Sequence, residues 1–119
     1  MSDPLARPGQ IVDLRRCDRG LQAPQQLPLV RTGDVEIVQF VVPAGKELPT
    51  HEAQGEIVLH CLEGRVEVTA LGVSRELRAG QLLYLAINEP FSMRGREDAS
   101  LLAVIIMPRQ GPAVELVGK

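Results

Sequence analysis

Apolar and polar side chains alternate cleanly over residues 65–70. Val66, Val68 and Ala70 share one face, whereas polar side chains occupy the other. A period of two is typical of a half-buried β-strand. We therefore predict a strand here, and the turn Glu63-Gly64 predicts a hairpin with the strand before it.

The same pattern recurs along most of the chain. Apolar or alternating runs bounded by Gly, Pro and Asn predict further strands at 35–42, 56–62, 74–77, 82–86, 91–94 and 101–107, with a short one at 11–14. Residues 20–28, rich in Gln and Pro, indicate an extended loop, and no stretch has a sustained helical period. Short strands at this spacing favour an all-β sandwich or barrel.

This pattern divides the chain into three parts. We predict an N-terminal arm and loop at 1–33, a β-barrel domain at 34–108 and a C-terminal tail at 109–119. Residues 57–59 and 101–107 are apolar on both faces, so their strands need cover on both sides. In so small a domain we expect a second subunit to supply it, which predicts a homodimer to which the arm contributes.

Composition excludes several classes of partner. The chain has 119 residues, of which 45% are hydrophobic and 24% charged, as expected for one globular domain. A net charge of −2 and only three aromatic residues give no surface for nucleic acid. No apolar run is long enough to cross a bilayer, so we expect no membrane partner.

Cysteine usage indicates the compartment. Cys17 and Cys61 are far apart and have no zinc-like spacing with histidine, so neither a disulfide framework nor a structural zinc site is indicated. Free thiols and the lack of a signal-like N-terminus predict a cytoplasmic protein.

Two motifs carry a family resemblance. The segment from Gly45 through His51 to Gly64, and the segment from Gly80 to Phe91, resemble the two signatures of the cupin family in the correct order and separation. The resemblance covers about residues 35–107 and is nearest to small single-domain bacterial cupins. It implies a jelly-roll barrel, usually dimeric, whose interior often holds Fe, Mn, Zn or Ni through three His and one Glu.

The implied metal site is incomplete in this chain. His51 and Glu56 match the family's ligands, whereas Ala53 and Phe91 stand where the family has histidines. Catalytic metal sites normally use about three protein ligands, so two should hold a divalent ion weakly. We therefore predict a degenerate site and no cofactor; if a metal binds at all, its ligands are His51 and Glu56.

The resemblance and strand parity together predict a pocket inside the barrel. We expect it to be lined by His51, Glu56, His60, Phe91 and Met93, with Cys61 facing away. His60 is about 13 Å along the strand from Glu56, too far to share an ion with it. The alternative for both histidines is a hydrogen-bonded or solvated structural role, and Phe91 and Met93 could simply fill the volume of a lost metal site.

Three functions remain open from the sequence. The first is a non-catalytic or accessory protein that binds a small organic ligand in the barrel pocket. The second is a metal-dependent oxygenase or isomerase that uses His51 and Glu56 with an incomplete ligand set. The third is a structural dimer with a plugged barrel, which predicts that no ligand-sized cavity exists.

Overall fold

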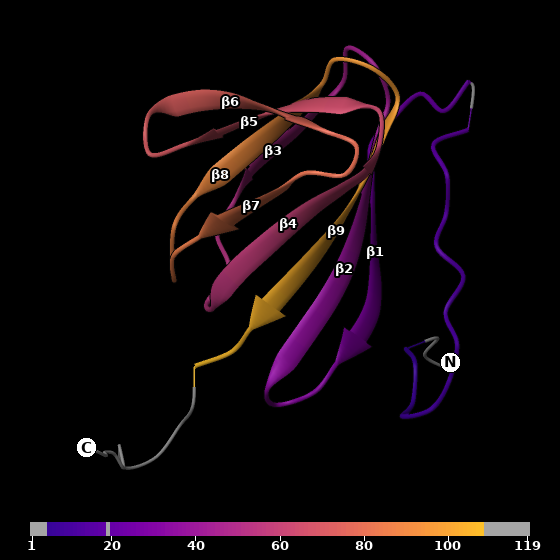
Figure 1. The fold of residues 1–119 in the computed structure, drawn as a ribbon, viewed down its shortest axis with the longest axis vertical. Helices are drawn as coiled ribbons and strands as arrows, with labels where there is room; N and C mark the ends of the chain where they lie inside the picture. The colour runs from indigo at the N-terminus through magenta and orange to yellow at the C-terminus, as the bar shows by residue number, and fades with distance from the viewer. Residues whose placement is uncertain (1–4, 19, 109–119) are drawn as a thin grey trace.

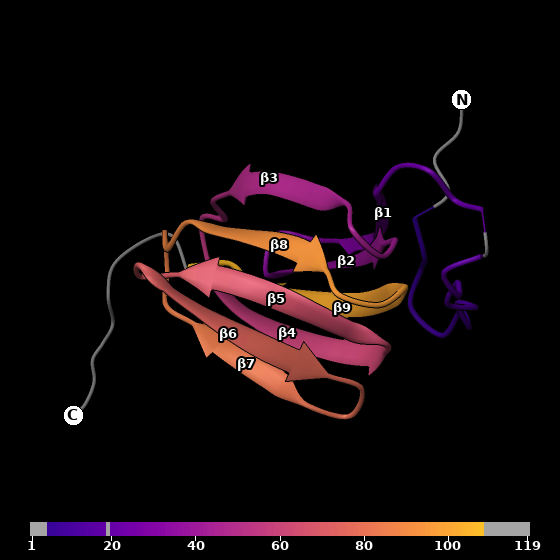
Figure 2. The same ribbon diagram turned by 90° about the horizontal axis from the view of Figure 1, so that it is seen from above.

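A computed structural model describes residues 5–18 and 20–108, which form two antiparallel β-sheets packed face to face (Figures 1 and 2). The larger sheet has the order β1 (Gln25–Arg31), β2 (Val35–Val42), β9 (Ala99–Ile106), β4 (Glu56–Glu63) and β7 (Leu82–Leu85). The smaller sheet has the order β3 (Glu47–His51), β8 (Phe91–Gly95), β5 (Arg65–Ala70) and β6 (Val73–Arg78). No strand pairing among the described residues joins the two sheets into a closed barrel.

The all-β prediction is confirmed, and so are most of its strands. The predicted strands at 35–42 and 65–70 have the observed bounds, and the strands predicted at 56–62, 74–77, 82–86, 91–94 and 101–107 differ from the observed ones by one or two residues at their ends. The predicted C-terminal tail, 109–119, lies outside the described residues.

Two predictions in the N-terminal part of the chain are wrong, and one strand was missed. Residues 11–14 form no strand, and Ile11 is 89% exposed. The expected loop at 20–28 contains the start of β1, and β3 was not predicted at all. Both strands are edge strands that contain a proline, Pro28 and Pro49, and proline is tolerated at an edge, where one side of the backbone needs no partner.

The core lies between the inner faces of the two sheets. Leu59 of β4 and Leu101 of β9 face Val66 and Val68 of β5, and all four side chains are at most 1% exposed. Cys61 belongs to this core and is fully buried, so the expectation that it faces away is wrong. Burial raises the pKa of the Cys61 thiol, which keeps it protonated at neutral pH.

The N-terminal arm lies along the larger sheet, beside β1 (Figure 1). The backbone N–H of Ala6 donates to the carbonyl of Leu29 on β1 at 2.9 Å. Further along, the buried amide of Gln39 donates to the carbonyl of Arg15 at 2.6 Å and accepts from the Arg15 N–H at 3.0 Å. The Gln39 amide also donates to the hydroxyl of Ser100 at 2.8 Å, so these buried polar groups are all paired.

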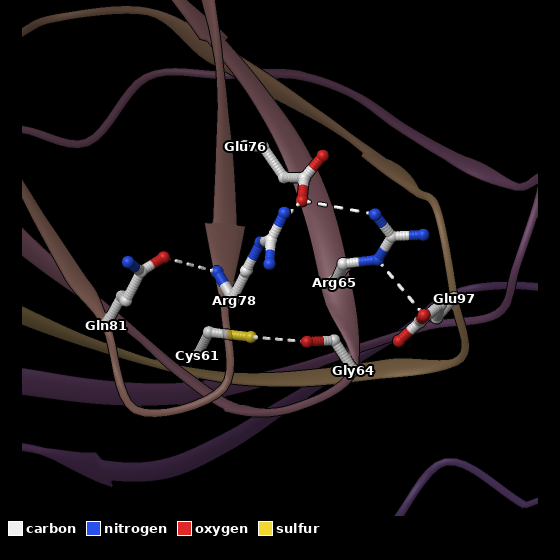
Figure 3. A network of polar contacts seen from close by, with 7 residues as sticks. All are labelled: Cys61, Gly64, Arg65, Glu76, Arg78, Gln81 and Glu97. Atoms are coloured by element: carbon white, nitrogen blue, oxygen red, sulfur yellow. Dashed lines mark hydrogen bonds and ion pairs between the residues drawn. The ribbon is translucent and has the colours of Figure 1, made fainter.

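The outer face of the smaller sheet is charged, and its side chains form ion pairs with one another. Arg65 on β5 lies between Glu76 and Glu97, at 3.3 and 3.0 Å, and Arg78 contacts Glu76 at 2.9 Å (Figure 3). The hydrogen bonds from Arg78 and Arg65 keep the pKa of Glu76 below its usual value. This face is therefore a solvated one.

The outer face of the larger sheet is apolar by contrast. Val58 on β4 pairs with Val104 on β9 and with Tyr84 on β7, and the next row pairs His60 with Leu102 and Leu82. Leu82 is 63% exposed, Tyr84 56% and Ile106 49%. We call this strip, made of Val58, Leu82, Tyr84, Leu102, Val104 and Ile106, the apolar outer strip.

Candidate ligand cavity

One end of the sandwich holds a cavity of about 430 Å³ between the two sheets. It opens where β1 and β2 of the larger sheet approach β3 of the smaller one. Its lining residues come from six strands and the β3–β4 loop: Gln26, Pro28, Arg31, Glu36, Val38, Phe40, Thr50, His51, Glu52, Ala53, Ile57, Phe91, Ala103 and Ile105. A structural dimer with a plugged interior predicts no such cavity, and that prediction is wrong.

His51 ends β3, is half-buried and lines the cavity. Its Nε2 lies 3.1 Å from Oε1 of Gln26 on β1, so a hydrogen bond spans the edges of the two sheets. Its ring centroid is 5.7 Å from that of Phe40 and 6.1 Å from that of Phe91. The predicted placement of His51 beside a pocket agrees with this geometry.

Phe91 and Met93 both point inward from β8, as predicted, but to different places. Phe91 is 3% exposed, meets the His51 ring edge to face and lines the cavity. Met93 is 2% exposed and belongs to the core cluster, and it does not line this cavity. Phe91 thus fills space beside the imidazole, whereas Met93 belongs to the core.

Comparison with solved structures identifies the architecture. An RmlC-like cupin protein from Desulfovibrio desulfuricans matches with a TM-score of 0.69 at 26% identity, over 85% of this chain and 96% of that one. An RmlC-like cupin family protein with a double-stranded β-helix fold from Methanocaldococcus jannaschii matches with a TM-score of 0.67 at 20% identity, over 83% and 94%. The chain has the cupin fold.

The other comparisons add little about activity. A conserved Streptococcus pyogenes protein of unknown function shares this cupin fold with a TM-score of 0.72 at 20% identity, over 92% of this chain and 98% of that one. No protein-family model matches the sequence, and no curated protein matches it. In the described part of the chain, no helix could span a membrane.

Two of the predicted pocket residues face away from the cupin interior. Glu56 is exposed and accepts a hydrogen bond from the Tyr84 hydroxyl at 2.9 Å on the outer face of the larger sheet. His60 lies on the same outer face, paired with Leu102 and Leu82. The inward position on β4 is that of Ile57, which is 1% exposed and lines the cavity. The inward assignment of Glu56 and His60 is therefore wrong.

The physical cause is strand parity. Side chains of successive residues on a strand face opposite sides of a sheet. Placing Glu56 on the inner face therefore also places His60 on the inner face and Cys61 on the outer face, the reverse of what the structure has. The apolar residues Ile57, Leu59 and Cys61 form the buried set.

The contact with Glu56 raises the pKa of Tyr84, because the neutral hydroxyl donates to the carboxylate and a phenolate would be repelled by it.

The donors at the cavity do not fit the metal centre that the cupin resemblance implies. His51 points into the cavity, whereas its expected partner Glu56 lies on the other side of the sheet. Ala53 and Phe91, which line the cavity, offer no donor atoms in their side chains. Among residues 5–18 and 20–108, no group of three His, Cys, Asp or Glu side chains could hold an ion together.

Several cavity residues were not found from the sequence. Gln26 and Arg31 belong to β1, which was expected to be a loop. Glu36 is the first of the β2 side chains that point into the cavity. Arg31 Nε lies 3.2 Å from Glu36 Oε2 at the rim, and Glu52 is an exposed carboxylate nearby in the lining. The alternation of Glu36, Val38 and Phe40 on β2 was the available signal for Glu36.

Proposed function

We propose that this protein binds a small organic molecule in the cavity between its two sheets and acts without catalysing a reaction, in a sensing or accessory role. The observation that carries the proposal is the 430 Å³ cavity with the His51–Gln26 pair at its mouth. Ligand sites are typically concave, mostly apolar and supplied with a few polar groups that fix orientation.

The distribution of side chains in the cavity supports a ligand with an apolar body and one polar group. Ile57, Phe91, Ala103 and Ile105 are buried and give the cavity apolar walls. Polar atoms of Gln26 and His51 lie at the mouth and can donate or accept a hydrogen bond. A ligand seated in this way would bury its apolar surface and keep its polar group at the solvent edge.

The alternative function, a metal-dependent oxygenase or isomerase, has less support. It needs His51 and Glu56 in one coordination sphere, and these side chains lie on opposite sides of the larger sheet. A binding role needs only the cavity and its convergent polar groups. We therefore favour binding over metal catalysis.

The proposal is tested by screening small aromatic and aliphatic fragments against isotopically labelled protein, with amide chemical shifts as the readout. We expect hits whose shifts cluster around Ile57, Phe91 and Ala103. Ala103→Leu, which adds bulk to the cavity wall, should abolish these shifts, whereas Val104→Leu on the outer face of the same strand should retain them. A complete absence of fragment binding to the unmodified protein would refute the proposal.

We further propose a homodimer formed through the apolar outer strip. The strip is apolar and partly exposed, whereas the outer face of the smaller sheet is neutralised by its own ion pairs. Large exposed apolar patches usually mark an interaction surface, and a flat sheet face can pair with its own copy about a two-fold axis.

The free thiols of Cys17 and Cys61 favour a reducing compartment, and we infer a cytoplasmic location from them.

A further inference from the structure

The rim of the cavity carries an uneven set of charges. Arg31 and Glu36 lie 3.2 Å apart and neutralise each other. Glu52 also lines the cavity, and no ion pair involving it occurs among the described residues. The lining thus contains two carboxylates, those of Glu36 and Glu52, and one guanidinium, that of Arg31.

We propose that this cavity selects ligands that carry an apolar body and either a neutral polar group or a cationic amine, and rejects anionic ones. This inference rests on the proposed function, because it concerns the ligand class of the same cavity. An anion entering the cavity would lose hydration and meet the uncompensated carboxylate of Glu52. The charge of the Arg31 guanidinium is already offset by Glu36, 3.2 Å from its Nε, so the lining holds no unpaired positive charge for an anion.

The same carboxylate that repels an anion attracts a cationic amine. A cationic group at the mouth would lie near the Glu52 carboxylate and could donate hydrogen bonds to it. Phe40 and Phe91 also line the cavity, and the face of an aromatic ring attracts a cation placed over it. A neutral hydroxyl meets no net penalty, since the Gln26 and His51 side chains can both hydrogen-bond to it.

The volume admits a ring-sized apolar body. An apolar cavity of about 150 Å³ is large enough to bind benzene. The cavity here has about 430 Å³, which accommodates a benzene ring together with one polar substituent directed at the mouth. Benzylamine, benzyl alcohol and benzoate share the ring and differ in charge, so they form a matched series of probes.

The test measures the affinity of the three probes at low salt by amide chemical-shift titration. We expect benzylamine and benzyl alcohol to bind and benzoate to bind about tenfold more weakly than benzylamine, since like charges repel at short range in a partly desolvated site. Glu52→Gln should reduce the ratio of benzylamine to benzoate affinity by about threefold or more, because it removes the uncompensated charge. Glu97→Gln makes the same change in net charge in the turn between β8 and β9, outside the cavity lining, and should leave the ratio unchanged.

The outcomes separate this inference from the function on which it rests. If benzoate binds as tightly as benzylamine, or if Glu52→Gln leaves the ratio unchanged, the selectivity is refuted and ligand binding stands. If none of the three probes, and no fragment, binds the unmodified protein, ligand binding itself is refuted together with the selectivity.

Discussion

Nε2 of His51 and Oε1 of Gln26 lie 3.1 Å apart and connect β3, an edge strand of the smaller sheet, to β1, an edge strand of the larger one. The contact bridges the two layers at the mouth of the cavity. A sandwich whose edges are not joined by backbone pairing depends on side-chain contacts of this kind to fix the gap between its layers.

The first prediction concerns this contact. In a double-mutant cycle, Gln26→Ala and His51→Ala should show a coupling of about 0.5 kcal/mol in the free energy of unfolding, since the bond is partly exposed. Urea denaturation of the four proteins measures it. Gln25→Ala is the matched control, because Gln25 has the opposite parity on β1, and it should show no coupling to His51→Ala.

The second prediction tests the parity of β4. The double variant Ile57→Glu with Phe91→His places two donors beside His51, so Zn²⁺ or Ni²⁺ should raise its thermal midpoint. Without metal it should be less stable than the unmodified protein by about 3 kcal/mol, because a carboxylate replaces a buried apolar side chain. Val58→Glu with Phe91→His directs the carboxylate outward and should not respond to metal; equal responses would contradict the assignment of faces.

The third prediction follows from the Tyr84–Glu56 hydrogen bond. Tyr84 is the only tyrosine in the chain and there is no Trp, so tyrosinate absorbance reports this residue alone. The carboxylate of Glu56 raises the pKa of Tyr84. Glu56→Gln should therefore move the alkaline titration to lower pH, whereas Glu47→Gln on the smaller sheet should leave it in place.

The same pKa shift has a defined effect on stability. The folded protein holds the phenolic proton more tightly than the unfolded chain, so the contribution is fully present below the unfolded pKa of about 10. It is lost as the pH rises through the folded pKa of Tyr84. Denaturation midpoints of the unmodified protein should thus fall more steeply above pH 10 than those of Tyr84→Phe.

The fourth prediction tests the dimer. Val104→Arg places a charge in the middle of the apolar outer strip and should weaken self-association by about a hundredfold or more, as expected for a central interface position. Thr69→Arg places the same charge on the outer face of the smaller sheet and should leave association unchanged. Sedimentation equilibrium gives the constants; a monomeric unmodified protein at high concentration would refute the proposal.

The fifth prediction concerns the turn between β4 and β5. Gly64 has φ +75°, and a Cβ at this position would overlap the backbone carbonyl of Asp98. Gly64→Ala should therefore cost about 3 kcal/mol or more, through strain and displacement of the neighbouring turn. Gly72 has φ +72° with open space around it, so Gly72→Ala should cost only about 1 kcal/mol. Similar losses in both variants would show that the close approach to Asp98 is unimportant.

Local patterns were sufficient where a strand has one buried face and one solvated face. Residues 65–70 are an example, because the alternation of Val66, Val68 and Ala70 with polar neighbours predicts both the strand and its inner side. The strands β1 and β3 were missed because each contains a proline and lies at a sheet edge, where local preference is weak. The inward placement of Glu56 is wrong because the apolar alternation of Ile57, Leu59 and Cys61, and not the motif position, decides which face of β4 is buried.

The sequence by itself determined an all-β sandwich or barrel and most of its strands, since side-chain alternation is a local property of the strand; the placement of His51 and Phe91 beside a pocket followed from the family resemblance. Only the tertiary structure decided that Gln26 of β1 meets His51 of β3 and that a cavity lies between them. Contacts between separate sheets depend on how the layers pack in space, and the spacing of residues along the chain does not encode that distance.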